Sequence, residues 1–189
     1  MSEYQYHEWQ TVDRVLTYEE QAAVNDLSSH IEVSPSRAVV TYHWSDFRHD
    51  PKQVLLKYFD AYFYLANWGS LRLMFRFPKG LVDTEAVLAY CIEDFIILET
   101  MGGYEVLDIT LDEEEGDGWV EGEGDLSTFA RLRDDLLQGD YRLLYVAWLK
   151  AIDLSRALDD EDGPDDLNQD LEPPVRWVSR IFLLRWTAL

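Results

Sequence analysis

The sequence predicts an α+β domain followed by a small helical unit, and three observations support this prediction. Apolar residues make up 47% of the chain and aromatic residues 14%, which is too much hydrophobic material for a disordered acidic protein. The elements expected up to Phe77 follow the order β-α-β-β-α-β, which is typical of a ferredoxin-like sheet, here with an extra helix and hairpin appended. Beyond residue 125 the apolar pattern becomes helical.

The first elements are indicated by local signals. Residues 4–12 are rich in aromatic residues and alternate loosely, which predicts a strand. Thr17 and Glu20 are spaced as a capping box, so we expect a helix from there to about Leu27. Residues 31–33 and 38–43 then predict two short strands.

Asp50-Pro51 is the strongest helix start in the chain, because Asp caps a helix and Pro at its first position loses only an amide without a helical partner. Apolar residues continue at helical spacing to Ala66, and Gly69 is expected to end the helix. Residues 71–77 predict a strand with arginines on one face.

The remaining elements of the first domain are a helix and a hairpin. A short helix is expected over residues 84–90, beginning near Asp83, and strands over 95–100 and 105–111 flank Gly102-Gly103. The α+β domain is therefore predicted to span residues 1–111.

Two acidic tracts distinguish the chain. Residues 112–125 and 159–172 each hold eight carboxylates and no Lys or Arg, in a chain with 37 acidic residues, 16 basic residues and a net charge of −21. Such a field repels nucleic acid and anionic membranes and attracts cations and basic protein surfaces. The glycines of the first tract indicate a flexible linker over residues 112–125.

Residues 126–189 are expected to form a helical unit. A helix from Leu126 ends at Gly139, and Asp140 begins a second helix, so the tight connection predicts an antiparallel helical hairpin. The side chains expected to point inward from the second helix include Leu144, Tyr145, Trp148, Leu149 and Ile152. An acidic loop over residues 159–172 and a last helix over 175–187 follow, and the last helix holds three arginines and no acids.

Two groups of side chains are candidates for small-ion binding. His43, Asp46 and His49 lie within seven residues and could bind a transition metal, although their spacing matches no known metal motif and a structural loop is favoured. Arg72 and Arg76, with Lys79, could hold an anion. The alternative is that the arginines pair across strands with acids, for which Glu8 and Glu32 are candidates, and this alternative is favoured in so acidic a chain.

Three strings resemble a family of acidic bacterial proteins for which no activity is established. They are MSEYQYHEWQTVDR, YFDAYFYLANWGSLRLMFRFPKGLVD and LLQGDYRLLYVAWL, and the resemblance covers most of the first 150 residues. It implies no catalytic residue and no cofactor. It also implies a genetic neighbourhood shared with SWIM zinc-finger proteins, and hence a pathway that involves nucleic acid.

Several features favour a soluble protein of the bacterial cytoplasm. The single cysteine, Cys91, cannot form an internal disulfide, and its apolar neighbours favour an inert thiol. The N-terminal residues do not resemble a signal peptide, and no apolar run is long enough to span a membrane.

The sequence therefore favours a non-enzymatic interaction protein that binds a basic surface of a protein partner. The alternatives are a DNA mimic that inhibits a nucleic-acid-binding protein and a metal-dependent hydrolase built on His43, Asp46 and His49. No cofactor, direct nucleic-acid binding or membrane binding is expected, and the last helix could also form a homodimer. The residues predicted to contact the partner are Asp112, Glu113, Glu114, Glu115, Asp159, Asp160, Glu161, Asp162, Trp177, Arg180 and Trp186.

Overall fold

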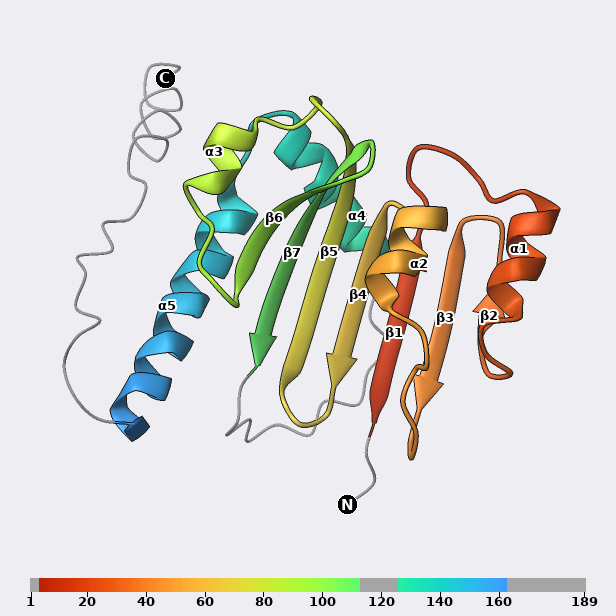
Figure 1. Cartoon of the computed structure of the whole chain (residues 1–189), viewed down its shortest axis with the longest axis horizontal. Helices are drawn as coiled ribbons and strands as arrows, with labels where there is room; N and C mark the ends of the chain where they lie inside the picture. The colour runs from red at the N-terminus through yellow and green to blue at the C-terminus, as the bar shows by residue number, and fades with distance from the viewer. Residues whose placement is uncertain (1–3, 113–125, 163–189) are drawn as a thin grey trace, which may run out of the picture. The chain divides into compact units, whose positions relative to one another are not determined.

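A computed structural model describes residues 4–112 and 126–162, and it has the predicted α+β composition. Seven strands form one antiparallel sheet in the order β2-β3-β1-β4-β5-β7-β6 (Figure 1). The chain divides into a compact unit Met1–Leu154 and a second unit Ser155–Leu189, of which only the end of one helix is described. No helix among the described residues is both long and apolar enough to cross a bilayer.

The elements have the following bounds. The strands are β1 Gln5–Gln10, β2 Glu32–Val33, β3 Arg37–Tyr42, β4 Ala61–Ala66, β5 Ser70–Pro78, β6 Ile96–Met101 and β7 Tyr104–Asp112. The helices are α1 Tyr18–Asn25, α2 Pro51–Tyr58, α3 Thr84–Leu88, α4 Leu126–Leu137 and α5 Arg142–Asp162.

The first four strands form two interleaved β-α-β units. Strands β1 and β2 are joined through α1 and are parallel to each other, with β3 between them and antiparallel to both. Strands β3 and β4 are joined through α2 and flank β1 in the same way. The helices begin where the sequence predicts, because Thr17 and Glu20 form the capping box and the Asp50 side chain accepts from the amide of Lys52.

The predicted helix over residues 51–66 is wrong in its second half. Helix α2 ends at Tyr58, Phe59 is extended, and Ala61–Ala66 is a central strand. Tyr62 lies on one face of that strand and Phe63 on the other, and both are buried. A strand covered on both faces is apolar without alternation, so its sequence can imitate the apolar face of a helix.

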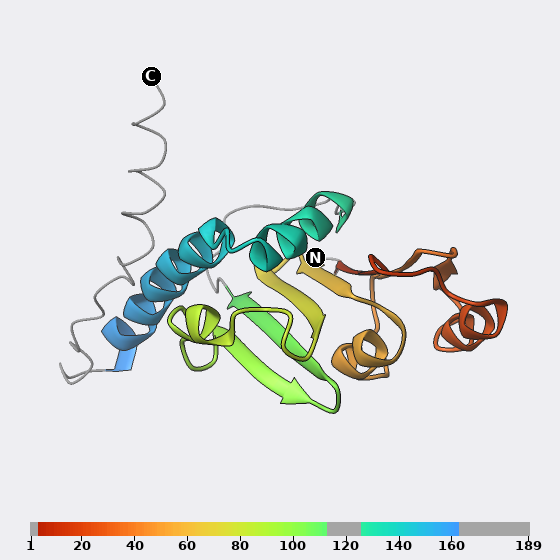
Figure 2. The same cartoon turned by 90° about the horizontal axis from the view of Figure 1, so that it is seen from above.

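The first face of the sheet carries α1 and α2 and holds the main apolar cluster. Figure 2 shows α2 (orange) on one side of the sheet and α4 (teal) on the other. The strands contribute Trp9, Val40, Tyr62, Met74 and Val106 to this cluster, and the helices contribute Val24, Val54, Leu55 and Tyr58. Burial of these side chains fixes both helices on the same face.

The second face of the sheet is covered by α4. Phe129 stacks on Phe63 with ring centroids 5.0 Å apart, and the amide of Leu126 donates to the buried Glu8 carboxylate at 3.3 Å. Helix α4 packs on β1 and β4 as part of the same compact unit. The boundary between the two units lies between Leu154 and Ser155, whereas the sequence predicts a linker over residues 112–125.

The predicted helical hairpin also needs correction. From Gly139, which has a positive φ of 81°, α5 diverges from α4 instead of lying along it (Figures 1 and 2). Asp159–Asp162, expected in a loop, belong to α5, and the predicted last helix lies outside the described residues. Leu144, Trp148 and Ile152 are buried as expected, whereas Leu149 is exposed.

Candidate protein-binding surface

One end of the sheet gathers aromatic side chains from three separate segments. The loop after β3, the β4–β5 turn and the start of β1 all lie at this end (Figure 1). Tyr4 connects them, because its ring lies 5.7 Å from the His43 ring and its amide donates to the Asn67 side chain at 3.0 Å. We call the surface formed by Tyr4, His43, Trp44 and Trp68 the aromatic end.

Two exposed tryptophans dominate the aromatic end. Trp44 is 77% exposed and Trp68 is 43% exposed. The indole nitrogen of Trp68 donates to the Ser70 hydroxyl at 2.9 Å, and Gly69 makes the turn with a φ of 97°. Large aromatic side chains on a stable scaffold are the residues that most often carry binding energy at protein interfaces.

Carboxylates lie beside these aromatic side chains. Asp46, in the same loop as Trp44, accepts from the Gln5 side chain at 2.6 Å. Asp112, the last residue of β7, pairs with Ser70 and is exposed, so the first acidic tract leaves the sheet at this end. The aromatic end therefore combines apolar anchors with negative charge.

A buried histidine lies beneath the loop that carries Trp44. His7 shares a hydrogen bond of 2.9 Å between its Nδ1 and the Tyr62 hydroxyl, and Phe47 packs on its ring at 5.6 Å. No hydrogen-bond partner is found for its buried Nε2 in the part of the chain that the structure describes. Burial lowers the pKa of His7 to about 4, although the nearby Asp46 opposes this shift. His7 is therefore neutral at pH 7.

The three residues predicted to bind a metal do not form a site. His43 packs against Tyr4, His49 lies 5.5 Å from the ring of Phe47, and Asp46 binds Gln5. Within residues 4–112 and 126–162 no three His, Cys, Asp or Glu side chains lie close enough to hold a metal ion. These contacts tie the loop that carries Trp44 to β1 and to Tyr4.

The arginines considered for anion binding are already paired. Arg72 donates to both oxygens of Asp108 at 2.9 and 2.7 Å, and Arg76 pairs with Asp60. Burial raises the pKa of Asp108, but the hydrogen bonds from Arg72 and Lys52 outweigh it and lower that pKa overall. Cross-strand pairing is confirmed for Arg72, whose partner lies on β7, whereas Arg76 pairs with Asp60 in the connection between α2 and β4. Neither acid is Glu8 or Glu32.

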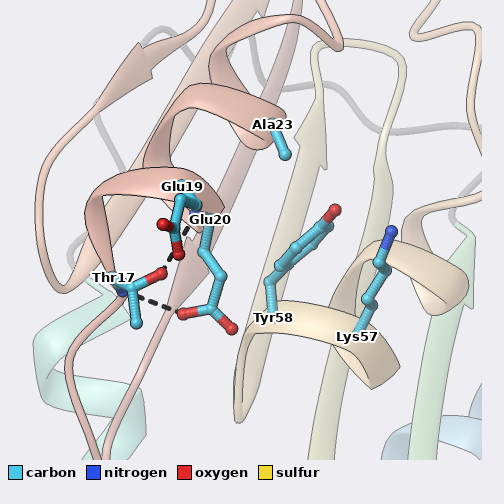
Figure 3. Close-up of a pocket in the computed structure, with 6 residues that line it drawn as sticks. All are labelled: Thr17, Glu19, Glu20, Ala23, Lys57 and Tyr58. Carbon is cyan, nitrogen blue, oxygen red and sulfur yellow. Dashed lines mark hydrogen bonds between the residues drawn. The ribbon is translucent and has the colours of Figure 1, made fainter.

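A hollow lies between α1 and α2 (Figure 3). It has a volume of about 400 Å³ and is lined by Thr17, Glu19, Glu20, Ala23, Lys57 and Tyr58. Glu20 closes the capping box and binds Arg14 at 2.7 Å, and these hydrogen bonds, the one from Arg14 first, lower its pKa to about 2. The hollow is shallow and its central carboxylate is occupied, so it does not resemble a catalytic pocket.

Most residues predicted to contact a partner fall where the structure gives no description. Glu113, Glu114, Glu115, Trp177, Arg180 and Trp186 lie outside the described residues. Asp159, Asp160, Glu161 and Asp162 form the last turn of α5, and Asp112 lies at the aromatic end. Sequence reasoning missed Trp44 and Trp68, although each stands beside residues that favour turns and loops, Ser45 and Gly69.

Comparison with known proteins adds no functional assignment. No protein-family model, no curated protein and no solved structure matches this chain.

Proposed function

We propose that this chain is a non-enzymatic interaction protein that binds a basic surface of a protein partner. The observation that carries the proposal is the pair of exposed tryptophans, Trp44 and Trp68, beside the carboxylates of Asp46 and Asp112. A net charge of −21 supports a basic partner by attracting it over a long range.

In this proposal the two tryptophans supply affinity and the acids supply orientation. An indole face attracts Arg and Lys side chains as well as apolar ones, so an aromatic end with acids at its margin suits a basic protein surface. The acidic tracts contribute much of the net negative charge and would raise the association rate with a basic partner. We further propose that the interleaved units of β1–β4 make the domain ferredoxin-like, and that it acts in the bacterial cytoplasm.

The test compares three proteins. The wild type, the Trp44→Ala/Trp68→Ala variant and a Tyr18→Ala control are used to capture proteins from a bacterial lysate at low and high salt. Tyr18 is an exposed aromatic residue of α1, away from the aromatic end. A captured protein is then purified, and its affinity for each of the three is measured by calorimetry.

We expect the double variant to weaken binding by at least about 30-fold, which is the size of a hot-spot loss, and Tyr18→Ala to leave it unchanged. Binding should also weaken as salt is raised. Equal affinity of the wild type and the double variant would remove the aromatic end from the proposal. Competition by duplex DNA would identify the partner as a nucleic-acid-binding protein, which is the DNA-mimic alternative.

A further inference from the structure

A second exposed surface runs along one side of α5. Arg142, Val146, Leu149 and Asp153 are spaced at i, i+4, i+7 and i+11, so they form one stripe on the helix. Val146 is 64% exposed and Leu149 46%, and the side chains of Arg142 and Asp153 are 72% and 80% exposed. We call these four residues the α5 stripe.

The stripe points away from the packed side of the helix. Leu144, Ala147, Trp148 and Ala151 are buried, and they hold α5 in the first unit. Next to Val146 lies a hollow of about 410 Å³ whose apolar walls are Leu132 and Leu143. The apolar surface therefore continues from the stripe toward α4.

The charges around the stripe are nearly balanced, unlike those of the whole chain. Between residues 131 and 153 the charged side chains that are not buried comprise four acids and three bases, whereas the chain as a whole has 37 acids and 16 bases. These residues are Arg131, Asp134, Asp135, Asp140, Arg142, Lys150 and Asp153. A basic partner gains little at such a surface, while two copies of a protein with a charge of −21 repel each other least here.

The order of residues along the stripe is self-complementary. If a two-fold axis passes between Val146 and Leu149 and relates two antiparallel α5 helices, Val146 meets Leu149 of the second copy, and Arg142 meets Asp153 of the second copy. A two-fold interface requires this reciprocity, in which residue i contacts residue j and j contacts i. We propose that α5 pairs with α5 of a second copy through this stripe to form a homodimer.

The charged ends of the stripe can make these contacts at little cost. Arg142 binds Asp140 of its own chain at 2.6 Å, and Asp153 lies 4.0 Å from Lys150, but all four side chains remain near the surface. Contact with a second copy therefore leaves no charge buried alone. Because only two apolar residues per copy lie at the centre, we expect a weak dimer with a Kd on the order of 10–100 µM.

The test is sedimentation equilibrium of the full chain over about 5 µM to 1 mM protein, a range that brackets this Kd. We expect Arg142→Asp and Asp153→Arg each to weaken dimerisation by about 10-fold, because each places like charges opposite one another. The double variant Arg142→Asp/Asp153→Arg restores the pair with its signs exchanged, so its Kd should return to within about 3-fold of the wild-type value. Lys57→Asp makes the same change of charge at an exposed position of α2, outside this set of residues, and is the matched control.

Two further measurements separate the second copy from other occupants of the stripe. Moderate salt should strengthen the dimer by screening the repulsion between the two acidic chains, which is opposite to the effect expected at the aromatic end. The reactivity of Val146→Cys toward thiol reagents, measured on a Cys91→Ala background, reports whether the stripe is covered. A chain that stays monomeric at all concentrations would overturn the proposal, and a protected thiol would then mean that the chain covers its own stripe. A monomer with a reactive thiol, or a double variant whose dimerisation does not recover, would also overturn it.

Discussion

Two arginine–carboxylate pairs with similar geometry occupy very different places in this protein. Arg14 binds both oxygens of Glu20 at 2.7 and 2.8 Å at the start of α1, close to the surface. Arg133 binds both oxygens of Asp13 at 2.7 and 3.2 Å, but its guanidinium is buried beneath α4. The first pair joins residues six apart in sequence, and the second joins residues 120 apart.

The difference shows that burial and sequence separation, more than the identity of the pair, decide what an ion pair contributes. An exposed pair is screened by water, and its energy is small. Arg133 is buried, so its guanidinium must be satisfied from all sides. It donates to the Arg76 carbonyl at 3.0 Å and lies 5.3 Å from the Phe77 ring. The Arg133 pair, in which the arginine is buried and Asp13 is half exposed, therefore fixes α4 on the sheet. The Arg14 pair supports a helix whose start is already stabilised by its own capping box.

The largest expected effect comes from Arg133→Ala. This change removes the pair, leaves the Arg76 carbonyl without its donor and opens space under α4. We expect the free energy of unfolding to fall by about 3 kcal/mol, measured by urea denaturation. Arg133→Met keeps most of the volume and should cost less than the alanine variant. A loss below about 1 kcal/mol for Arg133→Ala would show that burial does not distinguish the two pairs.

Glu8→Gln tests a second long-range contact of α4. The buried Glu8 carboxylate accepts from the Tyr6 hydroxyl at 2.8 Å, from Arg37 and from the amide of Leu126. A neutral amide offers one acceptor oxygen where the carboxylate has two, so we expect a loss of about 2 kcal/mol in the same unfolding measurement. Glu32→Gln, on the exposed edge strand, is the matched control and should change stability by less than about 0.5 kcal/mol. Equal losses in both variants would contradict the role given to Glu8.

The pH dependence of stability tests a buried group that has no ionic partner. His7 has a pKa of about 4 in the folded protein and 6.5 when unfolded, so the unfolded chain binds more protons between these values. The stability that depends on neutral His7 is complete above pH 6.5 and is lost as the pH falls toward 4. Between pH 7.5 and 5 we expect a loss of about 2 kcal/mol from this residue.

The matched measurement uses His7→Phe, which cannot titrate. Other groups contribute equally to both proteins, so the difference between the two pH profiles isolates His7. The wild type should lose about 2 kcal/mol more than the variant over this range. Parallel profiles would mean that His7 is hydrated or paired in solution.

Local signals in the sequence predicted the fold wherever a few neighbouring residues decide the structure. The capping box at Thr17, the cap at Asp50, the helix start near Asp83 and the β6–β7 hairpin all appear as expected. The error over residues 61–66 has a physical cause, because a strand buried on both faces carries no alternation to distinguish it from a helix. The position of α4 could not be predicted, since its contacts join residues between 57 and 120 positions apart.

The candidate surface was harder to predict than the fold. Composition directs attention to the acidic tracts, but the positions of Trp44 and Trp68 depend on where three distant segments meet. Leu149 was expected to point inward because it continues the apolar pattern of α5. A helix with apolar residues on most of its sides gives no sequence signal for which of them packing leaves uncovered.

The smallest expected effect is that of Arg14→Ala, and it completes the comparison of the two pairs. Glu20 keeps its bond to the Thr17 amide at 2.8 Å after the arginine is removed, so the capping box survives. Water replaces the guanidinium, and the loss should stay below about 1 kcal/mol. The difference between Arg133→Ala and Arg14→Ala in the same denaturation series then measures what burial adds to a similar pair. High salt should reduce the small contribution of Arg14 and leave that of Arg133 nearly unchanged, because ions screen exposed charges more than buried ones.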